Sequence, residues 1–120
     1  MRFLTLVKCA ETLGPPPQAL LAAIGELGQE AAAAGVLVET GGLLPTAAGA
    51  RVRVEGGTVS VAPGPFSEVK EPATGYAVFN VRSREDAIAW SRRFMAAHKE
   101  HWPGWVGETE IRQIMDFPKT

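Results

Sequence analysis

The stretch GYAVFNVRSREDAIAWSRRFM, residues 75–95, decides the fold because a strand pattern runs directly into a helix pattern. Apolar side chains occupy most of 75–81, which predicts a strand. Ser83 followed by Asp86 forms a capping-box pattern, so a helix is expected to begin there. This helix then carries an inward stripe at helical spacing, made of Ala87, Ile88, Ser91, Phe94 and Met95.

The first 35 residues show the same order of strand and helix. The short apolar run 2–8 predicts a buried strand. After the Gly-Pro-Pro-Pro break at 14–17, a helix is expected to begin near Pro16, because proline suits the first helical turn. Gly35 is expected to end it. The apolar stripe of this helix is Leu20, Leu21, Ile24, Leu27 and Ala31.

Several glycines lie in the region that follows the first strand. Gly25 and Gly28 lie inside the expected helix, where each costs about 1 kcal/mol relative to alanine. We expect them to let the helix lie close to the sheet. A short β-branched strand is expected at 36–39, followed by a turn at Gly41 and Gly42.

A β-hairpin is the clearest local pattern in the chain. Residues 51–55 and 58–62 alternate between apolar and polar side chains, and Gly56-Gly57 between them can adopt the positive φ angles of a tight turn. A proline-rich loop follows over 62–74, and a last strand is expected over 106–117. The apolar side chains that alternate along the hairpin are Val52, Val54, Val59 and Val61.

Taken together, the elements predict an α+β protein with one domain over residues 1–120. Without the hairpin, their order is β-α-β-β-α-β, the ferredoxin-like arrangement. Both helices are expected to cover one face of an antiparallel sheet. Since the other face also needs a cover, and a second copy of the chain is the simplest one, we expect a homodimer.

Composition narrows the possible partners. The 120 residues include 12 basic and 13 acidic side chains, so the formal net charge of −1 gives no electrostatic footprint for nucleic acid. The single cysteine, Cys9, excludes an internal disulfide. No apolar run has the length of a secretory leader or of a membrane span. We therefore expect a cytoplasmic protein that binds neither nucleic acid nor membrane.

The loop GPFSEVKE, residues 64–71, resembles the signature of the YCII-related family, in the branch named for its Asp-Gly-Pro-Phe motif (DGPF). The likeness extends to both sides of this loop and covers nearly the whole chain. Upstream it includes Gly35-Val36-Leu37, Gly42-Leu43-Leu44-Pro45, Val52-Arg53 and Gly57. Downstream it includes Gly75-Tyr76, Asp86-Ala87, Trp90 and Glu110-Ile111-Arg112.

This resemblance implies a dimeric α/β barrel, in which two ferredoxin-like protomers pack sheet against sheet. It also implies a small cytoplasmic protein, often associated with sigma-factor signalling. In enzymatic members a His–Asp pair is the proposed catalytic unit. Here Pro63 replaces the leading Asp of the signature, and the only histidines are His98 and His101, late in the chain. The His–Asp chemistry is therefore not carried over.

Candidate ligand-binding side chains lie on the signature loop and on the strands. Arginine suits a small anionic ligand because its planar guanidinium grips carboxylate or phosphate at two points. The alternative is that these charges form ion pairs on an exposed face or at the dimer interface, while the phenylalanine fills the core. The candidate set is Glu68, Lys70, Arg51, Arg53, Arg112 and Phe66.

The two histidines form a second, weaker pattern. His98 and His101 can share a helix face, and Glu108 could add a metal ligand. Alternatively, the nearby Trp102 and Trp105 pack under the helix end or at the dimer interface. No glycine loop of the phosphate-binding kind is present, so no nucleotide cofactor is implied. Two histidines without an obvious third ligand are a weak metal signal, so no metal is expected either.

Two function classes follow from the sequence. One is a ligand-binding or regulatory module associated with sigma-factor signalling. The other is a cofactor-free enzyme of lyase or hydrolase type that acts on a small anionic or aromatic substrate, with Glu68 as base. A closed pocket shared by Glu68, Lys70 and an arginine favours the enzyme, whereas side chains held in ion pairs favour the module.

Overall fold

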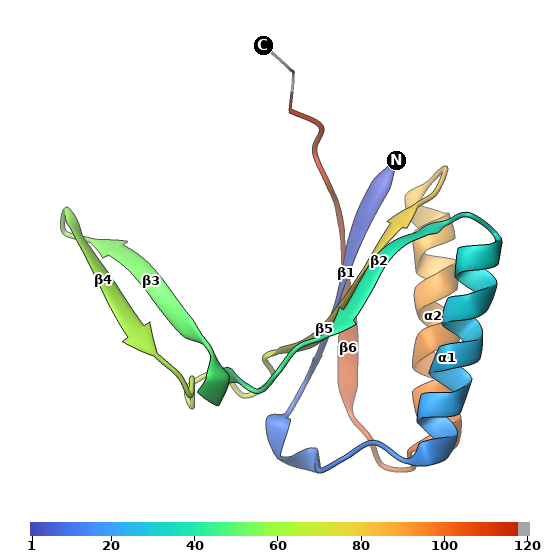
Figure 1. Ribbon diagram of the computed structural model, residues 1–120, viewed down its shortest axis with the longest axis horizontal. Helices are drawn as coiled ribbons and strands as arrows, with labels where there is room; N and C mark the ends of the chain where they lie inside the picture. The colour runs from blue at the N-terminus through green and yellow to red at the C-terminus, as the bar shows by residue number, and fades with distance from the viewer. Residues whose placement is uncertain (118–120) are drawn as a thin grey trace.

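Two helices cover one face of a four-stranded antiparallel sheet in the computed structural model, which describes residues 1–117 (Figure 1). The strand order is β2-β5-β1-β6, and β3 and β4 form a separate two-stranded sheet. The arrangement is consistent with the expected ferredoxin-like fold and its inserted hairpin. The elements are β1 (Arg2–Cys9), α1 (Gln18–Ala33), β2 (Leu37–Gly42), β3 (Ala50–Glu55), β4 (Thr58–Pro63), β5 (Ala73–Asn80), α2 (Arg84–His101) and β6 (Gly107–Gln113), with short 3-10 helices η1 (Glu11–Leu13) and η2 (Thr46–Ala48).

The core lies between the sheet and the helices. In β1, Phe3 and Thr5 are buried against the helices, whereas Leu4 and Leu6 point to the opposite face and are half-buried. In β5, Phe79 is buried on the helix side, directly opposite Phe3. The buried core cluster is Phe3, Ala31, Phe79, Val81 and Ala87.

The start of α2 and both ends of α1 lie close to the positions expected from the sequence. The Ser83 hydroxyl accepts a hydrogen bond from the Asp86 amide at 3.2 Å, which confirms the N-cap of α2. Helix α1 begins after Pro17, and Gly35 follows it with a φ of 73°, the left-handed conformation that glycine adopts without strain. Local sequence therefore sets the ends of both helices.

Three local expectations were wrong. Gly41 and Gly42 continue β2 instead of forming a turn. A Cβ at Gly41 would lie 3.0 Å from Cε1 of Tyr76, so this glycine makes room for the tyrosine ring. Gly25 and Gly28 do not bring α1 close to the sheet, because a Cβ at either would meet no atom within 4 Å. The last strand ends at Gln113 and not at residue 117.

The expected hairpin is confirmed and extends away from the main sheet (Figure 1). Its turn residues Gly56 and Gly57 have φ angles of 57° and 76°, both in the left-handed region. The hairpin and the main sheet together give the described chain a flat outline of 46 × 45 × 18 Å. The hairpin therefore leaves the side of the sheet opposite the helices open.

Candidate functional site

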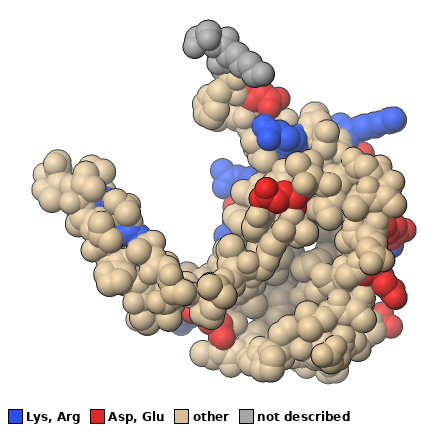
Figure 2. Space-filling view, viewed as in Figure 1, with Lys and Arg blue, Asp and Glu red and all other residues tan. Residues whose placement is uncertain are grey.

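A cavity of about 700 Å³ lies between the helices and the strands that they cover. Figure 2 shows the surface hollowed at this place. Ligand pockets in proteins commonly measure about 300–1,000 Å³, so the volume suits a small molecule. The helical wall includes Leu20, Leu21, Ile24, Leu27, Gly28, Trp90, Ser91, Phe94 and His98, and the strand wall includes Thr5, Val7, Cys9, Ala73, Gly75, Ala77 and Thr109.

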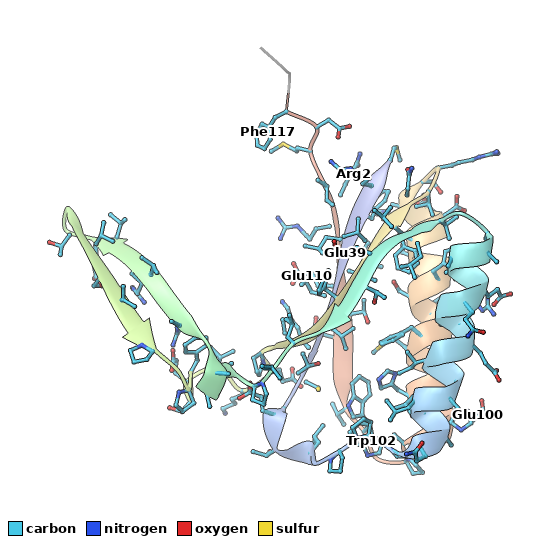
Figure 3. The ribbon with its side chains drawn as sticks, in the orientation of Figure 1. Arg2, Glu39, Glu100, Trp102, Glu110 and Phe117 are labelled. Atoms are coloured by element: carbon cyan, nitrogen blue, oxygen red, sulfur yellow. The ribbon has the colours of Figure 1, made fainter. Side chains whose placement is uncertain are left out.

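Small side chains on both walls account for this space. Helix α1 presents Gly28 and Ala31 to the cavity, and β5 presents Gly75 and Ala77 opposite them. Tryptophans close one end: Trp102 follows α2 (Figure 3), and Trp105 precedes β6. The core of the domain is therefore packed at one end and hollow at the other.

His98 is the principal polar group of the cavity. Its side chain is buried, with a ring that lies 4.7 Å from Phe94 and 4.3 Å from Trp105, centroid to centroid. Nδ1 lies 2.9 Å from the Phe94 carbonyl oxygen, which can only accept, so Nδ1 carries the proton and donates it. Nε2 of the neutral ring is then a hydrogen-bond acceptor.

The protonation state of His98 follows from the same surroundings. Burial lowers the pKa of the imidazole below its ordinary value of 6.5, and the hydrogen bond to Phe94 opposes this effect only in part. The ring is therefore neutral at pH 7. A neutral buried imidazole with Nε2 unprotonated can accept a hydrogen bond or a proton from a bound molecule.

Ser91 is the second polar group on the same helix face. Its Oγ is buried and has no hydrogen-bond partner among residues 1–117. Seven residues separate it from His98, which places the two side chains on one side of α2 about 10 Å apart along the axis. Buried hydroxyls are normally paired, so this unpaired one is the kind of group that a ligand would satisfy.

Other polar groups of the cavity already have partners. Thr5 Oγ1 donates to the Ala77 carbonyl at 3.1 Å. Cys9 Sγ lies 3.5 Å from Thr74 Oγ1. Thr109 Oγ1 donates to the thioether of Met95. His98 and Ser91 are consequently left to contact a ligand, together with the indole N–H groups of Trp102 and Trp105, which make no side-chain hydrogen bond within the described residues.

The cavity also lacks positive charge. Glu11 is the one carboxylate of its described lining, and that lining includes no lysine or arginine. The Glu11 carboxylate is held by Thr46, whose hydroxyl donates to Oε2 at 2.9 Å. An anion placed here would lose its hydration without a counter-charge, which is unfavourable. The lining favours an uncharged ligand.

Three of the side chains expected to bind a ligand meet at the base of the hairpin. The Arg51 guanidinium lies 4.0 Å over the ring of Phe66 and donates to the Glu68 carboxylate. That hydrogen bond is the main reason why the pKa of Glu68 is lowered. Arg53 lies on the same strand and pairs with Glu55 at 3.6 Å. None of these side chains lines the cavity.

The remaining candidates lie apart from this cluster. Arg112 is on β6, where it donates to Glu110 at 3.1 Å, and Glu110 also accepts from Lys8. The hydrogen bond from Lys8, followed by that from Arg112, lowers the pKa of Glu110. Figure 3 shows Glu110 on the side of the sheet away from the helices. Lys70 is exposed and makes no ion pair within the described part of the chain.

The sequence pattern of the YCII-related domain matches residues 1–118, almost the entire chain. The chain belongs to the YCII-related family. A search of curated proteins finds no match to it. This YCII-related assignment confirms the resemblance at the level of the family, while membership of the DGPF branch stays a prediction.

No helix within residues 1–117 of this YCII-related protein is both long and apolar enough to cross a membrane. The two histidines do not form a shared site in the protomer. His101 lies 3.8 Å from Glu100, whereas His98 turns into the cavity. The described residues contain no group of three or more His, Cys, Asp or Glu side chains arranged to hold a metal ion.

The sequence of the YCII-related chain contained a signal for the position of His98, although not for the cavity itself. The predicted inward stripe of α2 includes Ser91 and Phe94, and His98 continues that stripe one turn beyond Phe94. Trp102 follows after another four residues. Reading the two histidines as a pair, and not as members of the helix stripe, left His98 out of the candidate set.

Proposed function

We propose that this YCII-related protein is a ligand-binding module that takes a small, uncharged, mainly apolar molecule into the cavity between its helices and its sheet. The observation that carries the proposal is the cavity of about 700 Å³, which has a neutral His98 in its wall with the proton on Nδ1. His98 Nε2 accepts a hydrogen bond from the ligand, and the Ser91 hydroxyl makes the second polar contact.

The chemistry of the ligand follows from these contacts. An acceptor at His98 requires a donor on the ligand, so a phenol or an alcohol fits and a carboxylate does not. Apolar and aromatic walls surround the rest of the molecule. Because Ser91 and His98 are separated by about 10 Å along the helix, a ligand that contacts both is elongated.

The test is a thermal-shift and calorimetry screen of neutral phenols and alkyl alcohols against carboxylates and phosphates of matched size. A ligand present at 100 times its dissociation constant stabilises the folded protein by about 2.7 kcal/mol. We expect neutral hydroxylated compounds to stabilise the protein and the anions to have no effect. Stabilisation by the anions alone would contradict the proposal.

Two histidine variants locate the site. His98→Leu removes the hydrogen-bond acceptor from the cavity, and His101→Leu makes the same change one turn later on the same helix, outside the cavity lining. Loss of a hydrogen bond to a buried group costs about 1–3 kcal/mol, which corresponds to an affinity loss of about five- to 150-fold. The His98 variant should lose affinity and the His101 variant should keep it.

A cofactor-free enzyme is the second candidate, favoured by the unprotonated Nε2 of His98. Such a nitrogen can take a proton from a bound C–H or O–H acid, in the role of general base. The assay incubates the bound compound in D₂O and follows deuterium incorporation by NMR. Incorporation that depends on protein and disappears in His98→Gln supports the enzyme; binding without exchange supports the module.

Regulation is a further part of the proposal. The resemblance of the loop at 64–71 to the DGPF signature supports a cytoplasmic module that works with a sigma factor, and it also supports a dimeric barrel. Arg51 and Glu68 neutralise each other outside the cavity, so their ion pair leaves the preference of the cavity for an uncharged ligand unchanged. Co-purification with a sigma factor of the host, with and without bound ligand, tests the association.

A further inference from the structure

Four leucines lie where the cavity meets solvent. Leu13 belongs to η1 and Leu21 to α1, whereas Leu43 and Leu44 follow β2 directly. Each of them lines the cavity, and each is also exposed, from 42% at Leu13 to 80% at Leu44. A side chain that both lines a cavity and reaches water marks the mouth of that cavity. We call these four residues the leucine rim.

The two ends of the cavity differ in chemistry. Helix α2 and the segment before β6 supply aromatic and polar groups, which are Phe94, His98, Trp102 and Trp105. Helix α1 supplies aliphatic side chains instead, and the leucine rim adjoins them; those on the helix are Leu20, Leu21, Ile24 and Leu27. Helix α1 packs against β2 and α2 against β6, and these strands are opposite edges of the sheet. Three strand spacings of about 4.8 Å separate the edges, so the aromatic end and the aliphatic end lie about 14 Å apart.

A phenol alone leaves most of the cavity empty. A cavity of about 150 Å³ is large enough to hold benzene, and this one measures about 700 Å³. A phenol whose hydroxyl contacts His98 places its ring among the aromatic side chains and does not reach the leucine rim. Apolar walls that face no atoms lose their dispersion contacts. The aliphatic end therefore favours a ligand with an additional apolar part.

We infer, on the basis of the proposed function of the cavity, that the ligand is a phenol that carries an unbranched aliphatic chain. Its hydroxyl donates to Nε2 of His98, its ring lies beside the tryptophans, and its chain crosses the sheet to the leucine rim. Ser91 lies further along α2 and not across the sheet, so the chain does not displace a polar contact there. Exposed apolar side chains grouped at a groove are typical of a binding site, which supports the chain as their occupant.

The end of this chain is uncharged. Glu11 is exposed beside the leucine rim, on the same short helix as Leu13. Its carboxylate accepts hydrogen bonds from the amide and the hydroxyl of Thr46, and so connects the two segments that carry most of the rim. A second carboxylate at the end of the chain would be repelled by this charge. A chain that ends in a methyl group fits the mouth of the cavity.

The experiment is calorimetry with para-alkylphenols from methylphenol to hexylphenol, each below the concentration at which it aggregates. Every methylene that becomes buried should raise the affinity about fourfold, until the chain reaches solvent beyond the rim. Hexylphenol with a terminal carboxylate should bind less tightly than hexylphenol. Equal affinities for methylphenol and hexylphenol would overturn the chain and leave the proposed function intact. Binding of none of the phenols would contradict both.

Two substitutions locate the chain. Leu44→Asp places a charge on the leucine rim, and Val38→Asp places the same charge on β2, outside the cavity lining. Both side chains are more than half exposed, so the fold should tolerate either change. Leu44→Asp should lower the affinity for hexylphenol about tenfold and leave that for methylphenol unchanged. Val38→Asp should change neither. Equal effects of the two variants on hexylphenol overturn the inference.

A measurement on the native protein keeps the test independent of folding. In NMR spectra with labelled leucine methyl groups, the end of the hexylphenol chain should show nuclear Overhauser contacts to Leu21 and Leu44, and methylphenol should show none. Absence of these contacts for bound hexylphenol overturns the inference. Light scattering separates the remaining alternative: if Leu44→Asp changes the molar mass of the protein but not its affinity for hexylphenol, the rim contacts another protein and the inference fails.

Discussion

Ser91→Ala should stabilise the unliganded protein and weaken its binding of ligand. Ser91 Oγ is buried on α2 without a hydrogen-bond partner in residues 1–117. Mutational data put the cost of such an unpaired hydroxyl at about 1–3 kcal/mol. Alanine also has a higher helix propensity than serine, worth up to about 0.7 kcal/mol. Both effects raise the free energy of unfolding of the variant.

The size of this change is measurable by calorimetry. For a domain of about 100 residues, 1 kcal/mol shifts the midpoint of thermal unfolding by about 4–8 °C. We therefore expect Ser91→Ala to raise the midpoint by at least about 4 °C in the absence of ligand. Ser83→Ala is the control on the same helix, and loss of its N-cap bond should lower stability by about 1 kcal/mol.

The affinity of the same variant decides whether Ser91 belongs to a binding site. Removal of one hydrogen bond to the ligand should weaken binding by about 0.5–1.5 kcal/mol, or two- to tenfold. A variant that is more stable and binds less well would show that the hydroxyl is retained for the ligand. If Ser91→Ala is less stable than the native protein, Oγ has a partner in solution and the reasoning fails.

Three further predictions concern pH, the hairpin base and helix α1. Since burial lowers the pKa of His98, the unfolded chain binds a proton there at higher pH than the folded one. The contribution of His98 to stability is therefore complete above pH 6.5 and decreases as the pH falls from there through the lowered pKa of the folded state. In urea titrations, the free energy of unfolding should depend less on pH for His98→Gln than for the native protein. Glu68→Ala breaks the ion pair with Arg51 and should speed hydrogen exchange at the hairpin base while calorimetry shows unchanged binding in the cavity. Gly28→Ala should raise the free energy of unfolding by about 1 kcal/mol in thermal unfolding, because a Cβ there meets no atom within 4 Å.

The sequence was sufficient for features that depend on local chemistry. Ser83 and Asp86 predicted the start of α2, and Gly56-Gly57 between alternating valines predicted the hairpin and its turn. These signals lie within a few residues of one another, so tertiary contacts do not override them. Gly41 was misinterpreted because its role depends on Tyr76, which is distant in the sequence.

The cavity could not be predicted because it results from small side chains on elements that are distant in the sequence. Gly28 on α1 and Gly75 on β5 are remote in sequence, and no local pattern shows that both line the same space. The sequence pattern favoured charged residues instead, since arginine and glutamate are common in binding sites. In the protomer Arg51 and Glu68 neutralise each other at the hairpin base, and the polar groups of the cavity are a histidine and a serine that a helix stripe can hide.

Several residues that line the cavity reduce the stability of the domain, and their clustering is the strongest argument for a binding role. Gly28 weakens α1 by about 1 kcal/mol relative to alanine. Ser91 buries an unpaired hydroxyl, and burial disfavours the charged form of His98, which reduces stability at acid pH. A domain selected only for stability would lose such features, because single substitutions such as Gly28→Ala and Ser91→Ala remove two of them. All three residues line the same cavity, so a bound molecule that fills the space and pairs with both polar groups would offset these costs together.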